Sequence, residues 1–178
     1  MSLSHLQQFI LKLNRATSQD FGTLMKSMDV PKSEFEACAC WEHDHYSRNC
    51  LARTDDFELI LLCWKRGHDT PIHNHGGQRC WVYQIAGEVT EARYQKNASG
   101  GLELSNELHL KPGDLTYMDD SMGYHVLKNN SDEYAMSLHL YVAPIDACKI
   151  FNSESEVFET KPLSYDTEVE ELEKFIDH

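Results

Sequence analysis

Along the first forty residues, apolar side chains recur at the spacing of a helix. In residues 2 to 17 they stand three or four positions apart, at Leu3, Leu6, Phe9, Ile10 and Leu13. This period predicts an amphipathic helix, and Ser4 and Gln7 stand at the distance of a capping box. Shorter helical patterns cover residues 21 to 28 and 33 to 40, on either side of Pro31. We therefore predict short helices over about residues 1 to 45.

After Phe57 the pattern changes to short runs of β-branched and aromatic residues. Six such runs, separated by Gly, Asn, Asp or Pro, are "FELILLCWK", "CWVYQIAG", "EVTEARYQ", "GDLTYM", "GYHVLKN" and "EYAMSLHLYVA". Each predicts a strand, and no helical pattern intervenes. Closely spaced strands favour a sheet that closes on itself, because closure removes unpaired edges. We predict a mainly β fold, a barrel or jelly roll over about residues 46 to 162.

The length of the chain favours a single domain over residues 1 to 178. Residues 163 to 178 are rich in acids, and we expect them to form a surface helix or tail. We expect no linker, internal repeat or leader sequence.

Net charge and cysteine content limit the possible binding partners and the location of the protein. Sixteen Lys and Arg against 29 Asp and Glu give a formal charge of −13, which repels nucleic acid and anionic lipid. We therefore expect neither nucleic-acid nor membrane partners, and we expect a monomer. The six cysteines are spread through a chain large enough to fold without disulfides, which indicates reduced thiols and a cytoplasmic location.

The His-x-His pair His73 and His75 is the strongest chemical signal in the chain. On an extended backbone, residues two apart project from the same face, so both imidazoles can converge on one ion. With Gly67, Cys80 and Gly87 they form the pattern G-x5-H-x-H-x4-C-x6-G. This pattern resembles the first motif of the cupin superfamily, with Cys80 where many cupins carry a glutamate ligand. The resemblance implies a cupin-type β-barrel.

A second block, residues 113 to 129, supplies a third histidine. His125 and Asn129 resemble the second cupin motif, although its usual proline is missing and His125 comes one residue late. His139 is the alternative third ligand. A second His-x-His pair, His43 and His45, has no glycine frame, and we expect it to be an ordinary surface feature.

Five pieces, two of which contain the histidines described above, narrow the resemblance to the cysteine dioxygenase branch of the thiol dioxygenases. They stand in that family's order across roughly residues 40 to 150: "YSRN" (46 to 49), "LCW" (62 to 64), "HNHGGQRC" (73 to 80), "DSMGYH" (120 to 125) and "SLHLY" (137 to 141). The resemblance implies that His73, His75 and His125 bind Fe2+. It also implies that L-cysteine and O2 are the substrates and cysteine sulfinic acid the product.

The chemistry of three imidazoles agrees with this expectation. Three protein ligands leave positions open for substrate and oxygen, and because Cys80 replaces a carboxylate, the ion keeps its full charge until an anionic thiolate arrives. The same histidines would also bind nickel, zinc or copper. The alternative is a structural zinc site that includes Cys80, but such sites usually use several thiolates and fill all four positions.

Two residues of "YSRN" are candidates for substrate binding. A chelated amino acid still has a free carboxylate, and the planar guanidinium of Arg48 is its best partner in a dry pocket. The resemblance assigns that role to Arg48 and places Tyr46 nearby. Relatives that prefer 3-mercaptopropionate carry glutamine at this place, so Arg48 favours cysteine. Arg79 is a competitor that we expect to face outward.

Ser137, His139 and Tyr141 alternate with two leucines, so they share one face of a strand. If that face points into the barrel, its polar groups must be hydrogen-bonded, and Ser137 and His139 would hold the Tyr141 hydroxyl near the metal. The resemblance implies a catalytic role for these three residues and for Cys80. The alternative is a strand with its polar side in solvent.

Cys80 and Tyr141 also predict a covalent crosslink. Animal cysteine dioxygenases form a thioether between the equivalent cysteine and tyrosine, so the resemblance implies that a fraction of molecules carries a Cys80–Tyr141 thioether. The alternative is a free, packed thiol.

Two other functions remain open at this stage. One is the same fold acting on 3-mercaptopropionate or cysteamine, and the other is a non-catalytic cupin that binds a metal or a small molecule as a sensor.

Overall fold

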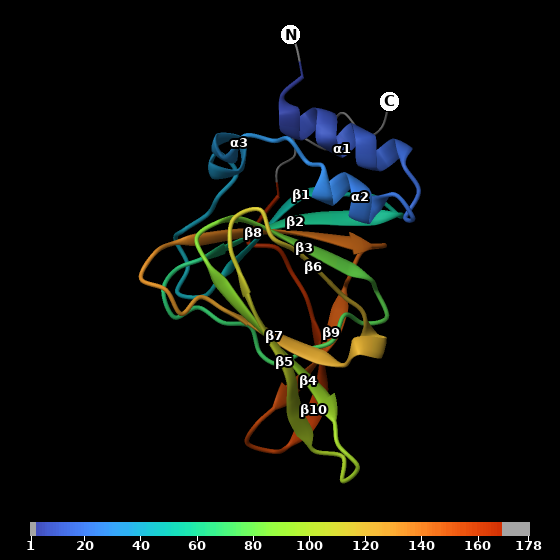
Figure 1. Ribbon diagram of the computed structural model, residues 1–178, viewed down its shortest axis with the longest axis vertical. Helices are drawn as coiled ribbons and strands as arrows, with labels where there is room; N and C mark the ends of the chain where they lie inside the picture. The colour runs from blue at the N-terminus through green and yellow to red at the C-terminus, as the bar shows by residue number, and fades with distance from the viewer. Residues whose placement is uncertain (1–2, 169–178) are drawn as a thin grey trace.

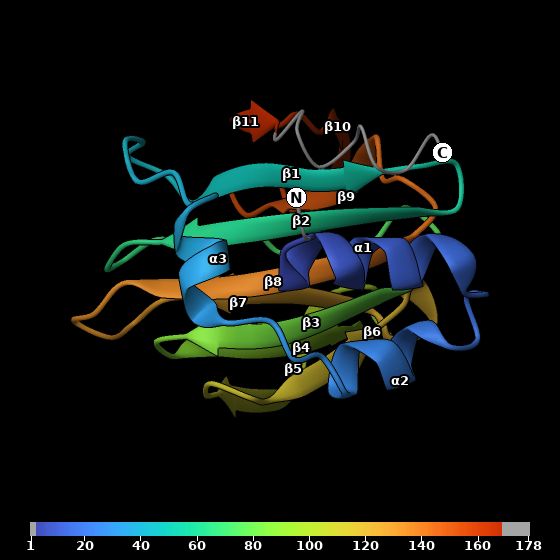
Figure 2. The ribbon, with the colours of Figure 1, turned by 90° about the horizontal axis from the view of Figure 1, so that it is seen from above.

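Three short helices cover the outer face of a six-stranded sheet (Figures 1 and 2). The structure is a computed structural model that describes residues 3–168. The helices are α1 (His5–Arg15), α2 (Phe21–Lys26) and α3 (Lys32–Glu36), and a 3-10 turn (Asp120–Met122) follows later. Ser4 and Gln7 form the predicted capping box, each side chain bonded to the backbone of the other. All three helices are shorter than the predicted segments.

The remainder of the described chain is almost entirely β. Its strands are β1 (Ser47–Arg53), β2 (Phe57–Trp64), β3 (Cys80–Ala86), β4 (Val89–Lys96), β5 (Leu102–Leu110), β6 (Leu115–Met118), β7 (Tyr124–Lys128), β8 (Ala135–Val142), β9 (Ala147–Asn152), β10 (Val157–Pro162) and β11 (Thr167–Glu168). The six-stranded sheet has the order β11-β1-β2-β8-β3-β6. A sheet β5-β4-β7 and the hairpin β9-β10 lie across from it (Figure 1).

The six predicted strands correspond to β2, β3, β4, β6, β7 and β8, so the expectation of a mainly β barrel is confirmed. Strands β1, β5, β9, β10 and β11 are additional. In the expected acidic helix or tail, residues 163–168 form no helix, and the short strand β11 pairs with β1 in parallel. Residues 169–178 lie outside the described part of the chain.

Alternate side chains of β2 and β8 point to opposite faces of the sheet and belong to two different apolar layers. Leu59, Leu61, Leu138 and Leu140 belong to the layer shared with the helices. Their neighbours point the other way, into the space between the sheets, where Trp64 belongs to a second apolar cluster. Fully burying each such large side chain contributes roughly 1.5–3 kcal/mol, so the helix-facing layer is a major source of stability.

Within residues 3–168, no helix has both the length and the apolar character that crossing a bilayer requires.

Candidate metal centre and substrate pocket

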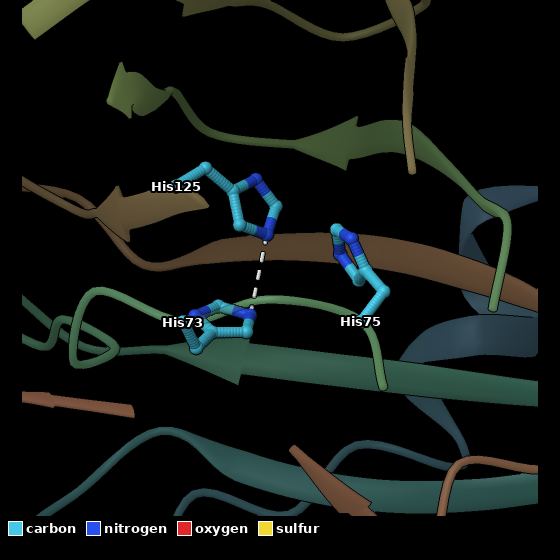
Figure 3. A group of neighbouring side chains, drawn as sticks. All are labelled: His73, His75 and His125. Carbon is cyan, nitrogen blue, oxygen red and sulfur yellow. Dashed lines mark hydrogen bonds between the residues drawn. The ribbon is translucent and has the colours of Figure 1, made fainter. Parts of the chain in front are cut away.

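Two segments bring three histidines together inside the barrel. His73 and His75 lie in the connection between β2 and β3, and His125 lies in β7. His73 and His125 exchange two backbone hydrogen bonds of 2.9 Å, which fix the connection against the strand. One ring nitrogen from each of the three histidines lies within 4.8 Å of the others (Figure 3). The structure thus brings together the trio named from the sequence.

The hydrogen bonds of the rings leave their lone pairs facing one another. The Nδ1 atoms of His73 and His125 contact acceptors, the Pro71 carbonyl at 2.9 Å and a Glu91 carboxylate oxygen at 2.8 Å, so in the neutral rings both Nδ1 atoms donate. The two Nε2 atoms, which then carry lone pairs, lie only 3.2 Å apart. Both ring nitrogens of buried His75 lack a partner within the described residues. Unpartnered acceptors that converge in this way fit a metal cation.

Burial keeps the rings of His73 and His75 neutral. Removal from water lowers the pKa of His73 to about 3, and the proximity of His125 acts in the same direction. Burial likewise moves the pKa of His75 well below its ordinary value. Neutral imidazole is the form that binds metals.

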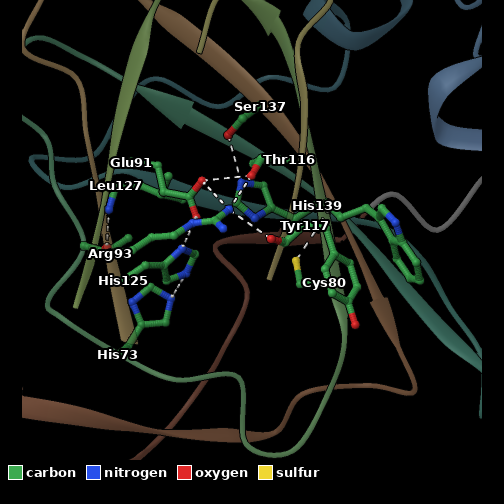
Figure 4. Close-up of polar contacts among 12 residues, drawn as sticks. His73, Cys80, Glu91, Arg93, Thr116, Tyr117, His125, Leu127, Ser137 and His139 are labelled. Carbon is green, nitrogen blue, oxygen red and sulfur yellow. Dashed lines mark hydrogen bonds and ion pairs between the residues drawn. The ribbon is translucent and has the colours of Figure 1, made fainter. Parts of the chain in front are cut away.

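Glu91 on β4 orients His125 and was not identified from the sequence. Burial raises the pKa of this carboxyl, but its bonds with His125 and Arg93 outweigh that effect and bring the pKa to about 2. Arg93 donates to it through Nε and Nη2, both at 3.1 Å, and the Thr116 hydroxyl donates at 3.0 Å (Figure 4). A buried carboxylate behind a histidine fixes the ring orientation and raises the basicity of the other nitrogen. The available signal was its inward-facing position in "EVTEARYQ", two residues after Val89.

Asp120 joins the two histidine blocks. Its carboxylate accepts from the backbone N–H groups of His75 and Gly77, both at 2.8 Å, and from the Asn74 side chain at 3.0 Å. It lies in the 3-10 turn that precedes His125, so one side chain positions both parts of the trio.

A pocket of about 210 Å3 opens beside His73. It is lined by Tyr46, Arg48, Pro71, His73, Tyr141, Ile145, Cys148, Ile150, Lys161, Pro162 and Leu163. The proposed carboxylate partner and one proposed metal ligand therefore line the same small space.

The segment after β10 holds Arg48. Its Nε donates to the Ser164 carbonyl at 3.1 Å, and its Cζ lies 6.0 Å from the centre of the Tyr165 ring. Its backbone N–H donates to the Asp166 carboxylate at 2.8 Å, and the Asp166 N–H donates back to the Arg48 carbonyl at 2.8 Å. The buried Nη2 has no partner within residues 3–168, so it is free for an anion. Arg79 instead donates to Ser18 in the helical layer.

The remaining predicted residues lie close to this pocket, and two of them, Tyr46 and Tyr141, line it. Tyr46 stacks on Trp64 at 4.9 Å, and Trp64 Nε1 donates to the Ser137 hydroxyl at 2.9 Å. The Ser137 hydroxyl bonds His139 Nε2 at 2.9 Å, and the His139 and Tyr141 rings are 6.4 Å apart. Ser137, His139 and Tyr141 are buried, so the polar face of β8 points into the barrel rather than into solvent.

Cys80 lies directly opposite Tyr141 in the antiparallel pair β3–β8. The thiol is fully buried, and burial raises its pKa far above the ordinary value despite a side-chain hydrogen bond with Tyr141. Among the described residues, the possible metal ligands grouped with His73 and His75 include His125. Neither Cys80 nor His139 belongs to this group.

Facing sheets around an inward-facing histidine trio define the class as a cupin-type barrel whose three histidines could hold a metal ion. Two crystal structures share the fold: a Thermus thermophilus protein (TM-score 0.51, 20% identity, 61% of this chain and 93% of the other) and a Bacillus halodurans protein (TM-score 0.50, 12% identity, 64% and 77%). These similarities describe the architecture alone.

Sequence comparison gives the family. The model of cysteine dioxygenase type I matches residues 2–154, and the chain belongs to that family. Cysteine dioxygenase type 1 of Homo sapiens is 29% identical over 138 residues, which cover 75% of this chain and 69% of the human protein. The Danio rerio protein of the same name is 26% identical over 152 residues, with 83% and 76% covered. The predicted membership in the thiol dioxygenases is thereby confirmed.

Proposed function

We propose that the protein is an iron-dependent dioxygenase that oxidises L-cysteine to cysteine sulfinic acid. The observation that carries this proposal is the unpartnered, buried Nη2 of Arg48 in a pocket that His73 and Tyr141 also line. An amino acid that reaches the histidines through its sulfur would find a guanidinium for its carboxylate in the same pocket. The family of the chain supports the oxidative chemistry.

His73, His75 and His125 would hold the ferrous ion. When bound, the ion supplies a site for a thiolate and for dioxygen, whose two atoms are both added to the substrate sulfur (RSH + O2 → RSO2H). Because the three ligands are neutral, an anionic sulfur donor is favoured over a neutral one.

The other pocket residues bind and orient the substrate. Arg48 pairs with the carboxylate, and this pair is strong because the pocket is small and largely apolar. Burial raises the pKa of Tyr46, so its hydroxyl stays protonated and able to donate. Burial also raises the pKa of Tyr141, which makes it a second protonated donor beside His75, with ring centres 5.9 Å apart. Trp64, bonded to Ser137, supports this wall of the pocket.

Oxygen uptake with three thiols tests the choice of substrate. We expect L-cysteine to be oxidised most efficiently, 3-mercaptopropionate less so, and cysteamine least, because it has no carboxylate for Arg48. Arg48→Gln should raise the KM for cysteine at least about tenfold, since a lost charge-assisted bond costs about 1.5–3 kcal/mol. Arg66→Gln is the matched control, because Arg66 is exposed and paired with Asp132. Equal kinetics of Arg48→Gln and the wild type on cysteine would contradict the carboxylate role.

Iron analysis tests the ligand set separately. Alanine at position 73, 75 or 125 should abolish retention of iron, whereas His109→Ala, an exposed histidine on β5, should leave it unchanged. Full iron occupancy in the triple alanine variant would overturn the assignment. If the purified wild-type protein contains no iron and forms no sulfinate, a binding function would be favoured instead.

A further inference from the structure

The bend before β1 carries a second group of metal-binding side chains. His43 and His45 approach Asp166, which lies 121 or more residues later in the chain, and one donor atom from each lies within 4.8 Å of the others. The Nε2 atoms of His43 and His45 are 3.7 Å and 3.2 Å from Asp166 Oδ1. The two imidazole rings lie 5.0 Å apart with an angle of 33° between their planes. The second His-x-His pair is therefore part of a cluster that its local sequence does not reveal.

The backbone of β1 holds Asp166 in place. Asp166 Oδ2 accepts from the Arg48 N–H at 2.8 Å, and the Asp166 N–H donates to the Arg48 carbonyl at 2.8 Å. Parallel pairing of β11 with β1 begins at the next residue, Thr167, opposite Asn49. Oδ1 is therefore presented to the two imidazoles by an ordered segment, which lowers the entropic cost of binding an ion.

We propose that His43, His45 and Asp166 bind a second divalent transition-metal ion, such as Zn2+, at the surface. Two ligands on a tetrahedral zinc, each about 2.1 Å from it, are about 3.4 Å apart, close to the 3.2 Å and 3.7 Å between each imidazole and the carboxylate. Water completes the coordination, because the side chains of His43 and His45 are 36% and 60% exposed. Two imidazoles select zinc, nickel or copper over calcium and magnesium, which prefer all-oxygen sites.

An ion at this position joins two segments that both adjoin Arg48. It ties the bend at residues 43–45 to the segment at 164–166, whose Ser164 carbonyl and Asp166 carboxylate already bond Arg48. The site is independent of the proposed dioxygenase activity, since none of its ligands lines the pocket. A hydrogen bond between His45 and Asp166 alone is the competing explanation of the cluster, and zinc binding distinguishes the two.

Zinc stoichiometry of the full-length, metal-stripped protein tests the proposal. By equilibrium dialysis, the wild type should bind two equivalents of Zn2+, His45→Ala one, His73→Ala one, and the double variant none. His109→Ala is the matched control, because it is an exposed histidine 3.5 Å from Glu107 and outside both clusters. It should retain two equivalents. Equal zinc binding by His45→Ala and the wild type overturns the second site, whereas equal binding by His73→Ala and the wild type overturns the proposed catalytic site instead.

Thermal unfolding provides a second readout. In the His73→Ala background, zinc should raise the melting temperature, because an ion that binds only the folded state stabilises it. The same addition should leave the melting temperature of the His45→Ala and His73→Ala double variant unchanged. Identical zinc-induced shifts in the two proteins would contradict the site, and His45 is exposed enough that its removal leaves the core intact.

Discussion

Glu91 and Cys80 are both fully buried near the histidine trio, yet their surroundings lead to opposite protonation states. Burial raises the pKa of each group. For Glu91, the bonds with His125 and Arg93 reverse this effect and give a pKa of about 2, so the carboxylate is charged. For Cys80, the hydrogen bond with Tyr141 is too weak to do so, and the thiol stays protonated. Glu91 can therefore orient His125 as a charged acceptor, whereas Cys80 is kept as a neutral thiol.

Replacing Glu91 with glutamine should weaken metal binding while keeping the shape of the side chain. Loss of a buried partner behind a metal-binding histidine typically reduces metal affinity about 10- to 100-fold. Competition with a ferrous chelator measures the change, and Glu107→Gln on exposed β5 is the control. Unchanged affinity in Glu91→Gln would show that the carboxylate does not influence His125.

Turnover with L-cysteine and O2 should convert a fraction of molecules to a Cys80–Tyr141 thioether. The two residues are direct partners across β3 and β8. The bond forms with loss of the thiol hydrogen and one hydrogen of the phenol ring, and O2 accepts these two protons and two electrons. Intact-protein mass spectrometry should show the loss of two hydrogens. Cys80→Gly should not show it, whereas Cys63→Ala, which lacks a cysteine of the helix-facing layer, should. An unchanged wild-type mass after turnover would leave Cys80 as a packed thiol.

At the scale of single elements, the turn before β7 determines where His125 lies. Gly123 follows the 3-10 turn with a φ of 97°, and a Cβ atom there would overlap the Tyr94 carbonyl oxygen. Only glycine satisfies both conditions without strain. The sequence motif "DSMGYH" contained this residue, but the close approach of β4 that requires it comes from tertiary structure.

Gly123→Ala should therefore affect both stability and the metal site. We expect a loss of at least about 2 kcal/mol in the free energy of unfolding, from backbone strain plus the clash, together with reduced iron retention. Gly113→Ala is the control, because it has a similar φ of 95° but open space around the added carbon. It should cost only about 1 kcal/mol and leave iron bound. Denaturant titration gives both values, and equal losses would contradict the role of the Tyr94 contact.

Glu34 fixes the start of α1 from a neighbouring helix. Burial alone would raise its pKa, but bonds from Leu6 and His5 lower it below the ordinary value of 4.5. Its oxygens accept from the backbone N–H groups of Leu6 at 2.8 Å and His5 at 3.1 Å.

Glu34→Gln should destabilise the protein by about 1 kcal/mol at neutral pH, the usual effect of a charged cap at a helix N-terminus. Because the pKa is lower in the folded state, this contribution is complete above pH 4.5 and is lost as the pH falls through the folded value. Unfolding curves at pH 7 and pH 3 should thus show a difference between the variant and the wild type that shrinks on acidification. A constant difference would contradict the electrostatic origin.

Strands were predictable where apolar or aromatic residues follow one another in a run. Strand β2 is buried along its whole length, and its apolar run predicted it. Strand β1 was missed because its polar side chains find partners far away: Asn49 bonds Thr167, and Arg53 bonds Asp146. Strand β5 was missed because most of its side chains are exposed. A strand stabilised by remote or solvent contacts resembles a loop when only its own sequence is considered.

At the scale of the whole molecule, the barrel and the histidine trio were predictable, but the surroundings of Arg48 were not. The three histidines could be identified because each lies within a short motif that also contains glycines at a fixed spacing. The Arg48 contacts depend on residues 164–166, and the pocket wall includes Lys161 and Leu163. Contacts between residues more than a hundred positions apart leave no periodic signal, so only the folded chain reveals them.

We expect the protein to be a monomer in solution. The large apolar side chains exposed among the described residues, Leu104, Tyr134 and Val157, come from three separate segments. A formal charge of −13 adds repulsion between copies. Light scattering after size exclusion should give the chain mass of 20.5 kDa. Twice that mass at low protein concentration would contradict the expectation.

The two apolar layers on either side of β2 and β8 allow the pocket residues to be substituted separately from the residues that hold the helices. The helix-facing layer is built from one set of alternating side chains, and the other set faces the barrel interior, where Tyr141 lines the pocket. Ile145 and Leu163 line the same pocket from outside both strands, so exchanges at these two positions would change its shape while the helix-facing layer persists. The pocket can therefore change its ligand preference without loss of the fold.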